Sequence, residues 1–347
     1  MIKSIKDFDV KNKRILVRCD FNVPLNEDGN ISDDFRIRKI LPTIQYLIKN
    51  KAKTILMGHL DNPDSSVTET TDVVKNRLEK LLKFKIKKTN DCVGDEVLKE
   101  VSNLTEGEVL LLENLRFHKE EVDNDDNFAK NLAKLGDIYI NEAFSVCHRA
   151  HASIVGIPKY LPSGAGFLLI KEIEALSKII NNPIKPLIAL IGGKNVKTKV
   201  KFINNISVLA HIVIVNGLIK KEILKEKLNF KDDKKIIGPL NDLDSLDLDQ
   251  KTIKFFSKKI LTAKTIIWNG PFGRFEDKKY QKGTLSIAKA IIKSGAFSVV
   301  GGGETVEFLN KNKLASKFSH ISTGGGAMID YLSGDKLPGI EALDNAL

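Results

Sequence analysis

The chain has 347 residues and a mass of 38.6 kDa, more than one hydrophobic core usually holds, so two domains are expected. Its composition, 42% hydrophobic and 29% charged, is globular, and its length excludes a small fold built on disulfides or a metal. No stretch approaches the roughly 18 uncharged residues of a membrane-spanning helix, and no secretory signal opens the chain. We therefore expect a cytoplasmic protein without a membrane partner, and its three cysteines are expected to be free thiols.

The formal net charge of +11 raises the question of a nucleic-acid partner. Only eight of the 55 basic residues are arginines, and no basic run is interleaved with aromatic side chains, as single-strand binders require. We therefore expect no nucleic-acid partner. The scarce arginines are more informative, because Arg36, Arg116 and Arg149 all fall in polar segments beside predicted strands. The planar guanidinium group of arginine, with its several N–H donors, is suited to binding an anion there.

Short β-branched runs alternate with segments of helical periodicity along the whole chain, which predicts parallel sheets flanked by helices. The helical segments include residues 37–48 and 171–180, and the second is followed by Pro183 and Pro186, as expected of a rigid connector. The fold class is therefore α/β, with two doubly wound parallel-sheet (Rossmann-like) domains joined by a hinge helix. The predicted strands are residues 14–18, 54–57, 109–112, 138–140, 187–191, 212–215, 265–268, 298–300 and 320–322.

The loops after these strands differ between the two halves. Ligands of open parallel sheets bind at the carboxyl ends of the strands, so these loops indicate function. In the first half they are polar and carry Arg and His, which suits a small carboxylate or phosphate. His59, His148 and His151 could instead suggest a metal cluster, but they share no ligand spacing and are accompanied by Arg.

In the second half the loops are rich in glycine, and 16 of the 24 glycines lie beyond residue 170. Glycine between a strand and a helix lets backbone N–H groups approach phosphate, so this half is expected to bind a nucleotide. Each glycine-rich loop taken singly could also be a tight turn that requires glycine. The sequence contains neither a P-loop motif nor a G-x-G-x-x-G motif. An anionic small molecule on one domain and a nucleotide on the other predict phosphoryl transfer by domain closure.

Seven blocks of the sequence carry a resemblance to a known family, and they are VRCDFNVPL, SDDFRIRKILPTI, LLENLRF, NEAFSVCHRAHAS, IIWNGPFGRFE, GGGET and HISTGGGA. At these blocks the chain resembles the phosphoglycerate kinase family, which moves a phosphoryl group between 1,3-bisphosphoglycerate and ADP, giving 3-phosphoglycerate and ATP in glycolysis. The resemblance spans nearly the whole chain and implies a Mg²⁺-dependent, monomeric, hinge-closing cytoplasmic kinase with small-molecule partners. It implies domains at 1–168 for phosphoglycerate and 184–328 for the nucleotide, a connecting helix at 169–183, and a segment at 329–347 that returns to the first domain.

The resemblance also implies residue roles. The phosphoglycerate-binding positions are Asp20, Asn22, Arg36, His59, Asn62, Arg116 and Arg149. The nucleotide positions are Gly192, Gly193, Lys199, Gly217, Asn269, Pro271, Glu276, Gly302, Gly303, Glu304 and Thr305. The catalytic positions are Arg36, Lys199 and Gly325, and Glu304 is the candidate ligand of the Mg²⁺ that accompanies ADP or ATP. Because the acceptor is a carboxylate, no general base is needed, and Arg36 is expected to stabilise the charge of the transition state.

The chain departs from the family pattern at three places. Asp61, Asn62 and Pro63 stand where the family has Gly-Arg-Pro, so one substrate-phosphate arginine is absent and an acidic residue has entered, which should lower affinity. Asn195 stands at the position of a lysine that faces the transferred phosphoryl group, with Lys194 and Lys197 as neighbouring substitutes. The stretch 220–239 is shorter than usual, which predicts the loss of a strand and of residues that cover adenine.

Two other functions stay open from the sequence alone. A catalytically weak or inactive relative that binds a ligand or a protein partner is favoured by Asn62, Asn195 and the shortened stretch. An electrostatic nucleic-acid binder is favoured only by the net charge, and its binding would weaken steeply with salt. The joint retention of arginines and nucleotide residues favours the enzyme.

Overall fold

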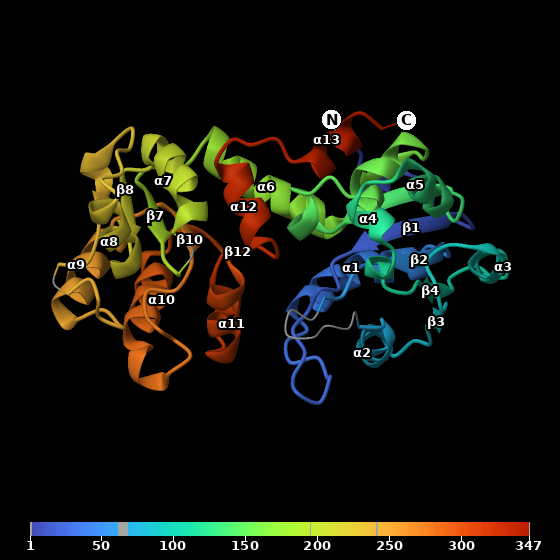
Figure 1. The fold of residues 1–347 in the computed structure, drawn as a ribbon, viewed down its shortest axis with the longest axis horizontal. Coiled ribbons are helices and arrows are strands. Elements are labelled where there is room, and N and C mark those ends of the chain that lie inside the picture. Colours follow the sequence, from blue (N-terminus) through green and yellow to red (C-terminus); the bar gives the residue numbers. More distant parts are fainter. Residues whose placement is uncertain (1, 62–68, 195, 241, 347) are drawn as a thin grey trace. The chain divides into compact units, whose positions relative to one another are not determined.

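The computed structural model describes residues 2–61, 69–194, 196–240 and 242–346 (Figure 1). The chain divides into two compact units. Unit 1 comprises Met1–Glu172 together with Lys336–Leu347, and unit 2 comprises Ile173–Asp335. The division falls inside one continuous helix, α6 (Phe167–Asn181), and the chain leaves unit 2 only after α12 (Gly325–Leu332) is complete.

Unit 1 is built on a parallel sheet of six strands in the order β3-β4-β2-β1-β5-β6. The central strands are buried on both faces, because helices cover each side of a parallel sheet, and most of their residues are apolar. The strands are β1 (Arg14–Cys19), β2 (Lys53–Met57), β3 (Lys87–Lys88), β4 (Val109–Leu111), β5 (Ile138–Glu142) and β6 (Ser163–Ala165). The helices are α1 (Phe35–Lys49), α2 (Asp72–Leu82), α3 (Asp95–Ser102), α4 (Lys119–Val122), α5 (Asp126–Ala133), the first part of α6, and α13 (Pro338–Asp344).

Helix α13 belongs to unit 1 although it ends the chain. The backbone N–H of Gly339 donates to the carbonyl oxygen of Cys147 over 2.9 Å. A Cβ atom at Gly339 would lie 2.7 Å from Cγ2 of Ile154, so only glycine permits this approach.

Unit 2 repeats the architecture with a parallel sheet in the order β12-β11-β10-β7-β8-β9. Its strands are β7 (Leu187–Ile191), β8 (Ile212–Val215), β9 (Ile236–Ile237), β10 (Thr265–Asn269), β11 (Phe297–Gly301) and β12 (His320–Ile321). Its helices are the rest of α6, α7 (Lys197–Leu209), α8 (Gly217–Lys225), α9 (Gln250–Ile260), α10 (Lys282–Ser294), α11 (Gly303–Lys311) and α12.

The predicted fold class is confirmed, and all nine predicted strands are present. The three strands that the sequence did not indicate are β3, β6 and β9, which have two or three residues each. Strand β9 forms within 220–239 and pairs with β8, and the loss of a strand relative to the family pattern stays a prediction. Strands β3 and β6 offer no apolar run by which they could be recognised, because their sequences are Lys-Lys and Ser-Gly-Ala.

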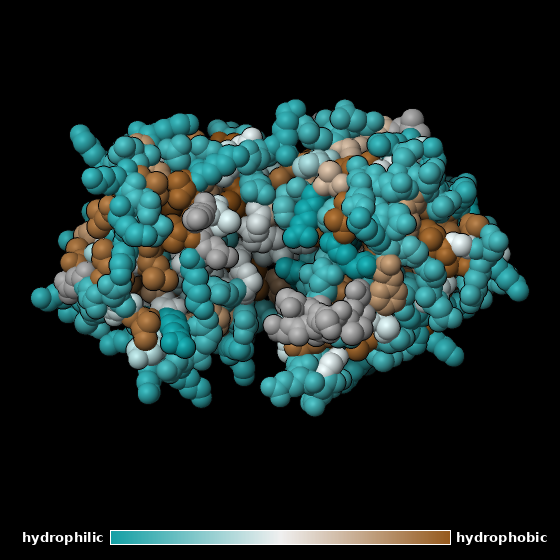
Figure 2. All heavy atoms as spheres, in the orientation of Figure 1, coloured by the Kyte–Doolittle hydropathy of each residue, from teal (hydrophilic) through white to brown (hydrophobic). Residues whose placement is uncertain are grey.

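The surface is dominated by hydrophilic side chains on the face drawn in Figure 2, with apolar side chains scattered among them. No helix within the described ranges is both long and apolar enough to cross a bilayer. Cys19, Cys92 and Cys147 are free, as the sequence predicted, and all three are buried.

A buried carboxylate ties the sheet of unit 1 to α6. Glu142, the last residue of β5, is fully buried and accepts hydrogen bonds from the N–H groups of Leu168 and Leu169 over 3.0 and 3.2 Å. Thr43 donates a third hydrogen bond to the same carboxylate. Burial raises the pKa of Glu142 to about 7, although these hydrogen bonds oppose the shift.

We expect Glu142 to make unit 1 less stable as the pH rises. An unfolded glutamate titrates near 4.5, so the folded state holds an extra proton between pH 4.5 and about 7. The stabilisation is complete below pH 4.5 and is lost as the pH rises through 7, up to about 3 kcal/mol in total. Chemical unfolding at several pH values should show this trend as the difference between wild type and Glu142→Gln. The exposed Glu120→Gln variant is the control, and parallel curves for wild type and Glu142→Gln would refute the prediction.

Candidate active site

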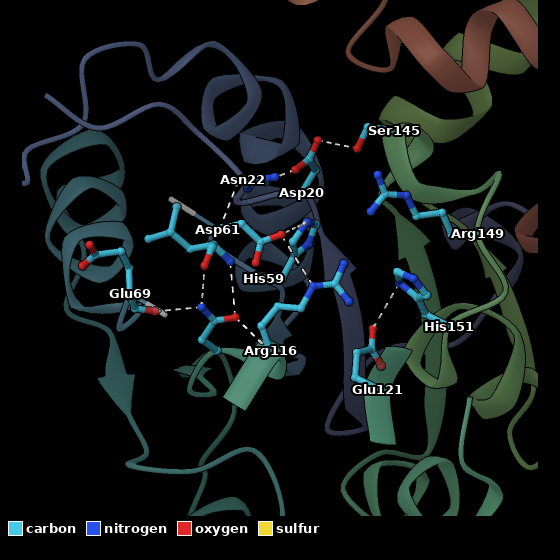
Figure 3. A network of polar contacts seen from close by, with 12 residues as sticks. Asp20, Asn22, His59, Asp61, Glu69, Arg116, Glu121, Ser145, Arg149 and His151 are labelled. Carbon is cyan, nitrogen blue, oxygen red and sulfur yellow. Dashed lines mark hydrogen bonds and ion pairs between the residues drawn. The ribbon is translucent and has the colours of Figure 1, made fainter. Parts of the chain in front are cut away.

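The predicted anion-binding residues of unit 1 gather at the carboxyl ends of its central strands (Figure 3). Asp20 and Asn22 follow β1, His59 follows β2, Arg116 follows β4, and Arg149 follows β5. Because β4, β2, β1 and β5 are neighbours in a parallel sheet, their four loops reach the same edge.

Arg36 joins this edge from the first turn of α1. Its Nη1 atom donates to the backbone oxygen of Asn22 over 2.7 Å and lies 3.2 Å from Oδ2 of Asp20. Asp20 is buried, and its carboxylate also accepts a hydrogen bond from Ser145. Arg36 remains 30% exposed, so its guanidinium is oriented by Asp20 and still accessible to a ligand.

A buried polar network lies beneath the cluster. Arg18, in β1, is fully buried and donates from Nε to Oγ of Ser153 over 2.8 Å and from Nη2 to Nδ1 of His59 over 3.1 Å. Glu121 accepts from the N–H and Oγ of Ser153 and lies 3.9 Å from Nη2 of Arg18. Arginine can only donate, so Nδ1 of His59 is the acceptor and Nε2 carries the proton.

The histidines of the cluster are neutral. Burial, followed by the charge of Arg18, lowers the pKa of His59 well below its usual value. Burial and Arg116 lower the pKa of His151 to about 4. The positive charge of this edge therefore comes from its arginines.

Asn114 fixes the loop that follows β2. Its side-chain amide donates to the carbonyl oxygens of Leu60 and Glu69, both over 2.7 Å, and its Oδ1 accepts from the N–H of Arg116 over 3.0 Å. Asn62, the next predicted substrate residue of this loop, lies outside the described residues.

Asp61 brings a carboxylate into the cluster. Its Oδ2 lies 3.6 Å from Nε of Arg116 and 3.7 Å from Nε2 of His59. Arg116 is mostly buried, and its Nη1 has no hydrogen-bond partner among the described residues. A buried donor without a partner is costly, so this atom indicates a place for an oxygen-rich ligand.

In unit 2 the glycine-rich loops pack directly on one another. The N–H of Gly192 donates to the carbonyl oxygen of Asn269 over 2.8 Å, and that of Gly193 donates to Pro271 over 2.9 Å. The N–H of Gly270 donates to Oγ1 of Thr305 over 2.9 Å. The loops after β7 and β10 thus pack backbone to backbone, and the side chain of Thr305 in α11 joins the start of that helix to them.

Two glycines in this surface permit close approaches of the backbone. A Cβ atom at Gly325, which begins α12, would lie 2.8 Å from Cα of Gly302. Gly302 itself has a φ of +95°, which favours glycine. Gly302 is the N-cap of α11, and Gly303 and Glu304 open that helix with exposed residues.

Lys199 lies beneath the same loops. It is 7% exposed, its Nζ donates to the carbonyl oxygen of Gly192, and Glu304 provides the nearest opposing charge. Burial lowers the pKa of Lys199 to about 8, although Glu304 opposes the shift. A phosphate bound beside Lys199 would favour the protonated, positively charged form of this side chain.

The remaining predicted nucleotide residues border this surface. Asn216, next to Gly217, donates to the carbonyl oxygen of Gly193 over 3.2 Å. Glu276 forms an ion pair of 3.3 Å with Lys194. Asn195 and the side chain of Lys197 lie outside what the structure describes, so the substitution of the missing lysine stays a prediction.

A model of the phosphoglycerate kinase family matches residues 5–237 and 225–335 of the chain. The chain belongs to the phosphoglycerate kinase family. It is therefore a kinase, a phosphotransferase of glycolysis that uses a nucleotide, and the function predicted from the sequence is confirmed.

Individual members of the phosphoglycerate kinase family are similar over nearly their whole length. The phosphoglycerate kinase of Borrelia hermsii is 40% identical over 390 aligned positions, which cover 99% of each chain. That of Dictyoglomus turgidum is 41% identical and covers 99% of this chain and 98% of its own. The crystal structure of the phosphoglycerate kinase from Pyrococcus horikoshii OT3 superposes with a TM-score of 0.90 at 31% identity, covering 99% and 98%.

The sequence did not indicate Arg18, Glu121 and Ser153, which form the polar network beneath the predicted anion-binding residues. Arg18 is a charged residue near the end of β1, whose remaining residues are apolar apart from Arg14 at its start, and this was the available signal. The partners of Arg18 are far away in the chain, 135 residues in the case of Ser153. Only folding brings them together.

One group outside this site has the side chains of a metal centre. The candidate ligand atoms of Asp91, Cys92 and His118 lie within 4.8 Å of one another. Oδ1 of Asp91 already lies 2.7 Å from Nε2 of His118 and accepts the N–H of Cys92 over 2.6 Å. These contacts account for the carboxylate without an ion.

We expect His59 to remain neutral, with its proton on Nε2, from pH 8 down to pH 6, because burial and Arg18 oppose protonation. Long-range ¹H–¹⁵N correlation spectra of labelled protein should show an unprotonated Nδ1 throughout this range. A doubly protonated ring at pH 6, or a proton on Nδ1, would contradict the geometry.

Proposed function

We propose that unit 1 binds the phosphoglycerate and unit 2 the nucleotide in reversible transfer of a phosphoryl group between 1,3-bisphosphoglycerate and ADP. The arginine cluster of unit 1 is the observation that carries this assignment. Arg36, Arg116 and Arg149 come from three different segments to one edge of the sheet, and Nη1 of Arg116 is a buried donor that has no partner among the described residues. A coupled assay of ATP formation from 1,3-bisphosphoglycerate and ADP tests the activity directly.

The residues of unit 1 are suited to a substrate with a phosphate and a carboxylate. Arg116 and Arg149 offer planar guanidinium groups, which bind such oxyanions through two parallel hydrogen bonds. The neutral His59 adds an Nε2–H donor, and Asp20 and Asn22 hold Arg36 in place. Asn62 is proposed as a further substrate residue on the resemblance alone.

Arg36 is the proposed transition-state cation. The acceptor carboxylate is already ionised at pH 7, so no group need remove a proton, and catalysis rests on position and charge. Asp20 and the carbonyl oxygen of Asn22 restrict the guanidinium of Arg36 before the substrate arrives. A cation fixed in advance costs little reorganisation during the reaction.

Unit 2 is proposed to bind the phosphates of ADP or ATP through backbone N–H groups and Lys199. The glycines of the loops at Gly192, Gly193 and Gly302 would let the phosphates come close to the backbone N–H groups. The N-termini of α11 and α12 favour negative charge. Gly325 begins α12 against Gly302 and is the proposed contact of the transferred phosphoryl group.

Glu304 is the proposed ligand of Mg²⁺. Its carboxylate is exposed at the start of α11 near Lys199, and one carboxylate together with substrate phosphates and water suits this ion. Bound Mg²⁺ would neutralise charge on the phosphate oxygens.

Family membership supports the rest of the proposal, which is a monomeric enzyme in the cytoplasm with Gly217, Asn269, Pro271, Glu276, Gly303 and Thr305 around the nucleotide. Closure about α6 on binding both ligands stays a prediction from the same resemblance.

Replacing Arg36 by alanine should lower kcat by about 100-fold or more, because a cation that acts mainly on the transition state is typically worth about 3 kcal/mol. Arg38→Ala is the matched control, since Arg38 is 53% exposed and pairs with Asp34 over 2.8 Å. Steady-state kinetics and thermal unfolding of both variants provide the measurement. Equal losses of kcat, or loss of folding in Arg36→Ala, would remove the role assigned to Arg36.

The affinity for ADP should fall as the pH rises through about 8, because the free protein then loses the charge of Lys199. The dissociation constant of wild type should rise about tenfold between pH 7 and pH 9. Lys199→Arg keeps its charge and should show a flatter profile, whereas Lys201→Arg, on the same helix, should behave as wild type. Calorimetric titrations at pH 7, 8 and 9 decide, and identical profiles for all three proteins would exclude Lys199 as the titrating group.

A further inference from the structure

We propose that Asp61 sets the affinity of this enzyme for its phosphorylated substrate. Its carboxylate acts as an internal counter-ion of the arginine cluster, which the substrate must displace. This inference rests on the proposed binding of phosphoglycerate by unit 1.

The backbone holds Asp61 at the cluster. The N–H of Asp61 donates to Oδ1 of Asn22 over 3.2 Å. The preceding residue, Leu60, is fully buried, and Asn114 binds both its N–H and its carbonyl oxygen. The main chain at Asp61 is thereby tied to the loops after β1 and β4, as the close-up in Figure 3 shows.

The carboxylate of Asp61, in contrast, is only loosely bound. It approaches Arg116 to 3.6 Å and His59 to 3.7 Å, beyond hydrogen-bond length, and accepts no hydrogen bond from the described residues. Its side chain is 42% exposed. Because His59 is neutral, Arg116 is the cation that attracts it.

The other two carboxylates of the site cannot leave in the same way. Asp20 is buried and bound by Ser145 and Arg36, and Glu121 is buried and bound by Ser153. Asp61 is therefore the acidic group whose removal changes the charge that a ligand meets.

The net charge of the site is small, so removing the carboxylate of Asp61 changes it substantially. Arg18, Arg36, Arg116 and Arg149 face the three carboxylates of Asp20, Asp61 and Glu121, which leaves one net positive charge. 3-Phosphoglycerate carries close to three negative charges near pH 8, because a phosphate monoester has about two and the carboxylate one. Without the charge of Asp61, the substrate meets twice the net positive charge, and Arg116 needs no exchange of partner.

Direct binding of 3-phosphoglycerate to the full chain tests this role. Asp61→Asn keeps the size of the side chain and removes its charge. The matched control is Asp123→Asn, which makes the same change of net charge at an aspartate that is 54% exposed and pairs with Lys119 over 3.4 Å. Calorimetry gives the dissociation constant of each protein, and the coupled assay gives KM and kcat.

We expect Asp61→Asn to bind 3-phosphoglycerate roughly five- to tenfold more tightly than wild type at low salt, since a half-exposed charge is screened by solvent. The gain should shrink at high ionic strength and appear in KM, with kcat changed far less. Asp123→Asn should match wild type.

Equal, measurable dissociation constants for all three proteins, or weaker binding by Asp61→Asn, would overturn the role of Asp61 and leave the proposed function intact. A fall in kcat with unchanged KM would also overturn it, because that pattern indicates altered positioning. Absence of binding in every protein would instead refute the assignment of the substrate to unit 1, and this role of Asp61 with it.

Discussion

The parallel pairing of the strands is the constraint on which both halves of this protein depend. A parallel ladder sends every strand in the same direction, so the carboxyl ends of β4, β2, β1 and β5 lie at one edge of unit 1. The same holds for β11, β10 and β7 in unit 2. Residues far apart in the chain therefore meet without any specific attraction between them, and the apolar strands supply the stability that holds them there.

The sheet edges of the two units present different kinds of positively charged groups. Unit 1 uses guanidinium groups, and their like charges are stable side by side because Asp20, Asp61 and Glu121 balance them. Unit 2 uses backbone N–H groups, which carry only partial charge and need glycine for close contact. A substrate with two separate oxyanions suits the first arrangement, and a chain of nucleotide phosphates suits the second.

Burial shifts the titration of several groups away from their usual ranges, with opposite results. It keeps His59 neutral above Arg18, so that the positive charge of the cluster lies on its arginines. It brings the pKa of Lys199 to about 8 and that of Glu142 to about 7, close to the working pH of a cell. These values come from tertiary burial, and the residue types alone would not predict them.

The sequence by itself indicated the α/β class, nine of the strands that the structure describes, and Arg36, Arg116 and Arg149 as candidate site residues, because strands buried on both faces need apolar runs and arginine is rare in this chain. It could not indicate β3, β6 and β9, whose few residues pair only because a longer neighbour presents its edge. Nor could it indicate Arg18 with Glu121, or Asp61 beside Arg116, since those pairs lie far apart in the chain. Only the tertiary structure decided them, because the sheet alone sets which loops become neighbours.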